Sequence, residues 1–228
     1  MDKYTQVYEK YINKYLLESS SNVVGIFPGA FKPPHMGHFE TALKASTLCD
    51  KVYIYISCKD RLCETPLEDP SETIHSPVPK KTDSDRYTNL VKKDSKYTTN
   101  LMDITCEEVE RLTSATILRN AIALRDANTI FENLPDAIDE DKHDVVDILL
   151  DNDGSITVEH TLKVWDIYRK HIIKETSMKK SNFIIKSSIP SPVKDTYDLV
   201  DSINNDIEVA NKTIIKLFVG KDKCTDDK

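Results

Sequence analysis

Apolar positions along the chain follow two different spacings, which predict two kinds of element. Short apolar runs rich in β-branched and aromatic residues predict strands at residues 23–27, 51–57, 100–106, 182–186 and 213–219. Apolar residues that recur every three or four positions predict helices at residues 3–17, 35–46, 114–124, 140–150, 157–173 and 190–203. Because strands and helices alternate, the pattern predicts an α/β fold with a doubly wound parallel sheet.

Two stretches stand apart from this alternation. Residues 1–20 are predicted to hold an amphipathic helix with one apolar face, which would pack on the rest of the chain or on a partner chain. A homo-oligomer therefore stays open. Residues 59–82 follow neither spacing and contain several prolines, so they are predicted to be a loop or linker. The remaining chain, over residues 22–222, is predicted to form one domain.

Composition and charge narrow the classes of partner. The 228 residues are 39% hydrophobic and 30% charged, as in ordinary globular proteins, and the net charge is −7. Such a charge argues against nucleic-acid partners and against binding to anionic membranes. No apolar run approaches the roughly 18–20 residues of a membrane span. Acidic residues among the first apolar positions, such as Asp2 and Glu9, are unlike a secretory signal peptide.

The five cysteines are odd in number and contain no pair with the C-x-x-C spacing of zinc sites. We therefore expect reduced thiols and a cytoplasmic protein. Cys58 and Cys63 are close enough in sequence to form a metal or redox pair, which is the less favoured alternative.

Residues 23–38 carry the first candidate chemistry. An apolar strand breaks at Pro28-Gly29, two further prolines follow, and a helix then begins with His35 and His38. A helix N-terminus offers backbone N–H groups and the positive end of the helix dipole, which favour phosphate. Residues three apart share a helix face, so both imidazoles would reach one ligand. The alternatives are structural polar residues or metal ligands, but zinc needs a third ligand that is not evident in the sequence.

A second group of phosphate-binding side chains lies at the predicted helix start near residue 114. Ser114 and Thr116 supply hydroxyls, and Arg119 follows one helical turn later. Hydroxyls donate to phosphate oxygens, and a guanidinium can fork onto the same group. Taken alone this pattern fits an ordinary N-capped helix. Together with the histidines it predicts the second half of a phosphate site.

Both groups resemble motifs of the nucleotidylyltransferase superfamily, which includes the nicotinamide-nucleotide, pantetheine-phosphate and choline-phosphate enzymes. Residues 29–38, Gly-Ala-Phe-Lys-Pro-Pro-His-Met-Gly-His, resemble its Gly-x-Phe-x-Pro-x-His-x-Gly-His signature. Residues 113–119 are similar to its Ile-Ser-Ser-Thr-x-x-Arg motif, with Thr in place of Ile and Ala in place of the second Ser. The resemblance implies a Rossmann-like fold and transfer of AMP, or less favourably CMP, to a phosphorylated acceptor.

The resemblance also implies roles for individual residues. Those expected at the reacting phosphates are His35, His38 and Arg119. Those expected to bind the nucleotide are Gly29, Ala30, Phe31, Lys32, Gly37, Ser114, Thr116 and Asp222. Mg²⁺ is expected to arrive with the NTP, held by phosphate and water rather than by a protein cage. The partners implied are ATP and a small phosphorylated acceptor.

The order of the segments departs from this family. Residues 83–150 resemble the closing third of viral and phage-type members, and residues 156–222 resemble their middle third. In the family the middle third comes first, so the two segments are exchanged here. This exchange, together with Ala115 at a serine position, motivates an alternative. On that alternative the chain is a non-catalytic nucleotide-binding or assembly protein with the same fold.

Overall fold

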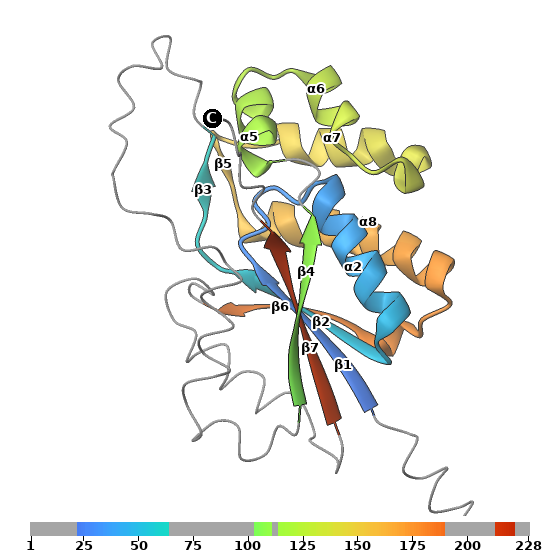
Figure 1. The fold of residues 1–228 in the computed structure, drawn as a ribbon. Coiled ribbons are helices and arrows are strands. Elements are labelled where there is room, and N and C mark those ends of the chain that lie inside the picture. Colours follow the sequence, from blue (N-terminus) through green and yellow to red (C-terminus); the bar gives the residue numbers. More distant parts are fainter. Residues whose placement is uncertain (1–21, 64–102, 111–113, 190–212, 222–228) are drawn as a thin grey trace, which may run out of the picture.

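The computed structural model describes residues 22–63, 103–110, 114–189 and 213–221 (Figure 1). These residues form strands, α-helices and two short 3-10 helices. In chain order they are β1 (Asn22–Gly29), α2 (Met36–Leu48), β2 (Lys51–Ser57), β3 (Arg61–Leu62), β4 (Asp103–Glu110), α5 (Ala115–Ala123), α6 (Ala127–Glu132), η2 (Asp136–Asp141), α7 (Lys142–Leu150), β5 (Ser155–Ile156), α8 (Val158–Thr176), η3 (Lys180–Asn182), β6 (Phe183–Ile189) and β7 (Thr213–Lys221).

The core of the fold is a parallel sheet of five strands in the order β4-β7-β1-β2-β6. Each neighbouring pair in this sheet is parallel. The chain steps outward from β1 to β2 and then β6, whereas β7 lies on the other side of β1 with β4 beyond it. The prediction of an α/β fold with a parallel sheet is confirmed.

Strand β2 shows why its residues form a central strand. Val52, Ile54 and Ile56 belong to the main buried cluster, whereas Tyr53 and Tyr55 alternate with them on the opposite face. The two tyrosine rings stack with centroids 6.0 Å apart. Both faces are buried, which explains the continuously apolar run typical of a central parallel strand.

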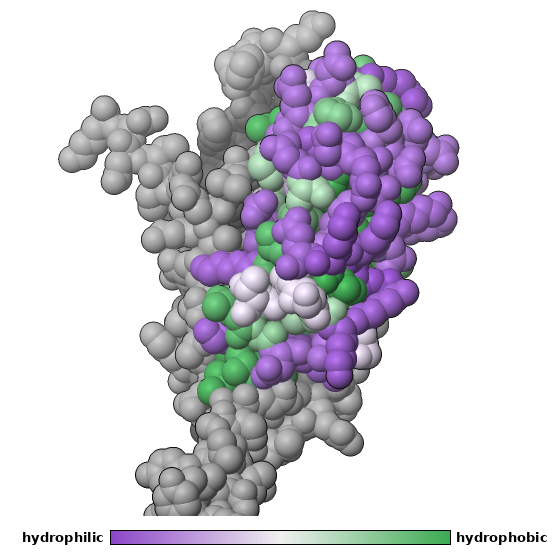
Figure 2. Space-filling view, turned by 90° about the vertical axis from the view of Figure 1, so that its right-hand side faces the viewer, coloured by the Kyte–Doolittle hydropathy of each residue, from purple (hydrophilic) through white to green (hydrophobic). Residues whose placement is uncertain are grey.

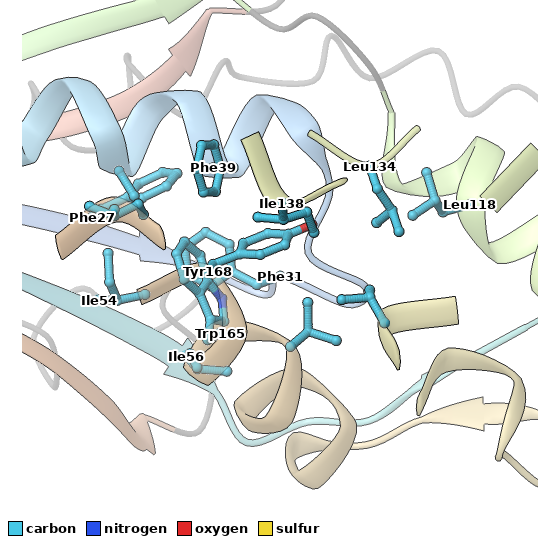
Figure 3. Close-up of a cluster of buried hydrophobic side chains, with 14 of the residues drawn as sticks. Phe27, Phe31, Phe39, Ile54, Ile56, Leu118, Leu134, Ile138, Trp165 and Tyr168 are labelled. Carbon is cyan, nitrogen blue, oxygen red and sulfur yellow. The ribbon is translucent and has the colours of Figure 1, made fainter. Parts of the chain in front are cut away.

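Helices α2 and α8 pack against each other and contact strands of the same sheet, α2 at β1 and β2 and α8 at β6. Their inner residues join a buried aromatic cluster (Figure 3) that includes Phe39, Trp165 and Tyr168. Seen from the side of these helices, the outer surface is mostly hydrophilic (Figure 2). The helices are therefore amphipathic, with apolar side chains toward the sheet and polar side chains outward.

Helices α5, α6 and α7 form a separate layer beyond the ends toward which β4 and β7 point (Figure 1). In this layer α5 packs on α6, α6 on α7 and α7 on α8. Among the described residues, no helix is long and apolar enough to cross a membrane.

Most predicted elements within the described residues are confirmed, with ends shifted by a few residues. The prediction of an irregular segment is wrong at Arg61–Leu62, which forms β3 and pairs antiparallel with β5. Such a short ribbon is stabilised by a partner distant in sequence, so the local pattern cannot reveal it. The predicted helices at 3–17 and 190–203 lie outside the described residues.

Candidate functional site

The loop between β1 and α2 follows the central strand of the sheet. Strand β1 has β2 on one side and β7 on the other. In open parallel sheets, ligands bind at the carboxyl ends of the strands. Gly29 ends β1, and Met36 begins α2, so the loop of interest occupies this position.

Phe31 fixes the conformation of this loop. Its ring is buried and contacts Trp165 edge-on, with centroids 5.2 Å apart (Figure 3). Its φ is 50°, in the left-handed region that a bulky residue rarely adopts. A Cβ at Gly29 would lie 2.6 Å from Cζ of Phe31. Glycine is therefore required at position 29 by the packed Phe31 ring.

The two predicted histidines face each other at the start of α2. His35 is the N-cap residue, and His38 lies in the first turn. Their rings are stacked with centroids 3.6 Å apart. The backbone N–H of His35 donates to Nδ1 of His38 over 3.2 Å. Because a backbone N–H can only donate, the neutral His38 ring carries its proton on Nε2.

The first turn of α2 is less open to a ligand than the sequence suggested. The Met36 N–H donates to the Asn133 carbonyl over 3.1 Å, and the His38 N–H donates to the His35 carbonyl over 2.9 Å. Two amides expected to approach a phosphate are thus already hydrogen-bonded. Side-chain donors therefore carry more of any anion binding here.

Arg119 joins the second predicted group to this loop. Its guanidinium donates to the Lys32 carbonyl over 3.1 Å and to Oγ1 of Thr116 over 3.0 Å. Ser114 caps α5, accepting the Thr116 N–H over 3.1 Å. The hydroxyls and the arginine are therefore held beside the loop that carries the histidines.

Lys32 is placed differently from the sequence expectation. Its side chain is buried, and Nζ donates to the Ser57 carbonyl over 2.6 Å and to the Lys59 carbonyl. Burial lowers the pKa of its ammonium group, and nearby Asp60 partly opposes that shift. The ammonium binds main-chain oxygens at the end of β2.

The other predicted residues divide into those near the loop and one that cannot be placed. Ala30 and Gly37 lie within or beside the loop, half-buried and buried respectively. Asp222 lies outside the described residues, directly after the end of β7.

Cys58 and Cys63, the alternative metal or redox pair, differ in their surroundings. Cys58 is exposed. Burial raises the pKa of Cys63, although the charge of Arg119 opposes this shift.

Sequence reasoning missed two residues that hold the loop from outside. Thr161 in α8 places its hydroxyl 3.4 Å from the Phe31 carbonyl while donating to the Thr157 carbonyl over 2.9 Å. Asn133 follows α6 and accepts the Met36 N–H through its carbonyl. Both are ordinary polar residues distant in sequence from the loop, so no local signal marks them.

Within the described residues, one group of three side chains has potential metal-ligand geometry, namely Glu140, Asp141 and His171. Oδ2 of Asp141 already bonds Nε2 of His171 over 2.6 Å and Nζ of Lys170 over 2.9 Å. Lys174 lies 3.8 Å from Glu140. Two ammonium groups at the carboxylates make this an ion-pair cluster that does not suit Mg²⁺, which needs oxygen ligands and neighbouring water.

Comparison with known proteins gives no match: no family model, no curated protein and no solved structure matches this chain. The site's own geometry therefore has to carry any functional conclusion.

Proposed function

We propose that this protein is a nucleotidyltransferase that transfers AMP from ATP to a small phosphorylated acceptor and releases pyrophosphate; CTP is the less favoured donor. One observation carries the proposal. The guanidinium of Arg119 bonds the carbonyl of Lys32, which brings the two predicted phosphate-binding groups together at the carboxyl end of the central strand of a parallel sheet.

The chemistry needs no covalent enzyme intermediate. An oxygen of the acceptor phosphate attacks the α-phosphorus, the bond from that phosphorus to the bridging oxygen breaks, and pyrophosphate takes the electron pair. The protein contributes alignment of the two reactants and stabilisation of the charge that develops on the leaving group. Mg²⁺ bound to the triphosphate would neutralise part of that charge.

The side chains divide this work according to their positions. His38 would donate from Nε2 to an oxygen between the α- and β-phosphates, because its Nδ1 is bound to the His35 amide. Arg119 would fork onto the β- and γ-phosphates, with the hydroxyls of Ser114 and Thr116 beside it.

The proposal includes a Rossmann-like, doubly wound sheet with exchanged segments. Reading outward from β1, the strands on one side are β2 and β6, and those on the other are β7 and β4. That spatial order matches a doubly wound sheet if β4 is counted last, although β4 precedes β6 and β7 in the chain. The face of the sheet opposite α2 and α8 is also buried, as both faces of a doubly wound sheet are; its buried side chains include Val24, Ile26, Tyr53, Tyr55, Ile215 and Leu217.

The test is pyrophosphate release with ATP and with CTP, each offered to a panel of phosphorylated acceptors. We expect release with at least one pair and a loss on the order of 100- to 1,000-fold in kcat for His38→Ala, as when one transition-state donor is removed. Absence of release with every pair contradicts the proposal.

His160→Ala is the matched control for this substitution. His160 holds the equivalent position in the first turn of α8, and its Nδ1 likewise accepts the N–H of the N-cap residue, Thr157. Its Nε2 contacts the Asp151 carbonyl at 2.9 Å, outside the loop of the candidate site. This variant should therefore lose some stability while retaining turnover.

Calorimetry with ATP distinguishes the proposed enzyme from the alternative, a non-catalytic nucleotide-binding or assembly protein. Binding of ATP without pyrophosphate release across the whole acceptor panel would favour that alternative. Absence of both ATP binding and pyrophosphate release would exclude both the enzyme and the non-catalytic alternative.

A further inference from the structure

Lys32 has an unusual environment for a lysine in a loop. Its side chain is 0% exposed, and its ion-pair partner within the described residues, Asp60, is 4.0 Å away and 55% exposed. The hydrogen bonds of Nζ go instead to the main-chain carbonyls of Ser57 and Lys59. A buried ammonium needs such oxygens because it has lost its water.

These bonds connect two loops at the carboxyl edge of the sheet. Lys32 belongs to the loop after β1, whereas Ser57 and Lys59 belong to the end of β2 and the turn that follows. The two strands are hydrogen-bonded neighbours, with Gly29 opposite Ile56. The lysine therefore ties together the two chain segments where these paired strands end.

The main chain of the same residue makes a third connection. The Lys32 carbonyl accepts from Arg119, the arginine of α5. His35 follows only three positions later in the same loop. A shift of the Lys32 backbone would therefore move Arg119 relative to the histidines.

A lysine that binds a phosphate directly has to present its ammonium at an accessible surface. Here the ammonium faces the interior and is held by protein oxygens. We propose that Lys32 is a positioning residue, whose buried ammonium locks the loop after β1 onto the end of β2 and so holds Arg119 and the histidines at a fixed spacing. This inference rests on the proposed nucleotidyl transfer for its effect on turnover.

The first experiment compares Lys32→Met with Lys44→Met. Methionine keeps an unbranched side chain but removes the charge and the donors. Lys44 is an exposed lysine of α2, so its variant controls for the loss of one positive charge. Because Arg119 and the histidines would lose their fixed spacing, Lys32→Met should reduce kcat on the order of 100-fold and change the KM for ATP by no more than about threefold. Lys44→Met should match the wild type.

Trp165 supplies a readout that does not depend on turnover. It is the single tryptophan of the chain, and it packs against Phe31, the residue before Lys32. Lys32→Met should shift its fluorescence emission in the absence of nucleotide, while Lys44→Met should not. Wild-type kcat and emission in Lys32→Met would overturn the inference, as would a rise in the KM for ATP with kcat unchanged, the result expected for direct contact.

The second experiment uses the wild-type protein, so it does not depend on a variant that folds. Lysines are acetylated in the folded state and quantified by mass spectrometry, with and without ATP. Lys32 should react far more slowly than Lys44, and ATP should not change its rate. Reaction of Lys32 as fast as Lys44, or protection only when ATP is present, would overturn the positioning role. If the wild type releases no pyrophosphate, the proposed function fails, whereas the fluorescence and acetylation results still decide the role of Lys32.

Discussion

Replacing Gly29 with alanine tests whether the loop conformation depends on the packing of Phe31. The added Cβ would lie 2.6, 2.7 and 3.0 Å from three atoms of the Phe31 ring, and the first two distances are shorter than Cβ contacts in real proteins. The ring has little room to withdraw, because its centroid lies 4.9 Å from that of Phe27 and 5.2 Å from that of Trp165. It also lies 4.9 Å from the ring of His38.

The magnitude follows from these contacts. Inserting a methyl group into a well-packed site costs about 1–3 kcal/mol. Disturbing one edge-on aromatic pair costs about 0.5–1.5 kcal/mol, and the Phe31 ring takes part in several. We expect Gly29→Ala to lower the free energy of unfolding by about 2 kcal/mol, which corresponds to a fall in Tm of about 4–8 °C for a chain of this size.

The assay is urea unfolding followed by the fluorescence of Trp165, which reports on this cluster directly. Phe31→Leu provides the partner for a double-mutant cycle, because it removes the ring that the new methyl group strikes. In that background Gly29→Ala should cost less than about 0.5 kcal/mol, so the two substitutions should be clearly non-additive.

Gly154→Ala is the control for backbone strain. Gly154 has a φ of 94°, but a Cβ there would meet no atom within 4 Å. A loss at this position therefore reports only backbone conformation, about 1–2 kcal/mol, and should not depend on Phe31. Wild-type stability of Gly29→Ala, or additive costs in the cycle with Phe31→Leu, would refute the packing argument.

Two further predictions concern the helices that frame the site. Hydrogen bonds to His171 and, to a lesser extent, to Lys170 lower the pKa of Asp141 in the folded protein. The stabilisation by Asp141 is therefore fully present above its unfolded pKa of about 3.9 and is lost as the pH falls through the lower folded pKa. Asp141→Asn should therefore lower the free energy of unfolding by about 1 kcal/mol at pH 7, measured by urea unfolding. The difference in stability from the wild type should shrink as the pH falls below about 4, and a difference independent of pH would contradict this. Thr157→Ala removes the N-cap of α8 and should cost about 1 kcal/mol in thermal unfolding. Lys163→Ala, an exposed change on the same helix, should leave the stability close to that of the wild type, and equal effects of the two substitutions would contradict the capping argument.

The elements that the sequence predicted well are those whose burial follows a simple repeat. Strand β2 is apolar along its length because both of its faces are covered, and its predicted bounds of 51–57 are the observed ones. Helix α8 repeats Val164, Trp165, Tyr168 and Ile172 toward the core, so its period is visible in the sequence. In both cases one local pattern records one buried surface.

The features that the sequence did not reveal depend on pairs of distant residues. Lys32 follows the Pro28-Gly29 break and precedes two histidines, so it was expected to bind phosphate. Its actual partners are carbonyls at the end of β2, and any residue type supplies a carbonyl. The packing of Phe31 against Trp165 likewise joins the loop after β1 to α8, and neither residue indicates the other. Local pattern therefore predicts which loops lie together at the sheet edge but could not orient their side chains.

A parallel sheet explains how such a site can be assembled from segments in an unusual order. In a parallel sheet every strand ends at the same edge, whatever its rank in the chain. Strand β4 precedes β6 and β7 in sequence, yet it lies beside β7 and parallel to it, so it delivers α5 and Ser114 to the edge at which β1 delivers the histidines. The bond from Arg119 to Lys32 then depends on strand position and register, not on chain order. An exchange of whole strand-containing segments would therefore preserve the contact between Arg119 and the loop after β1, whereas a single methyl group at Gly29 would disturb that loop.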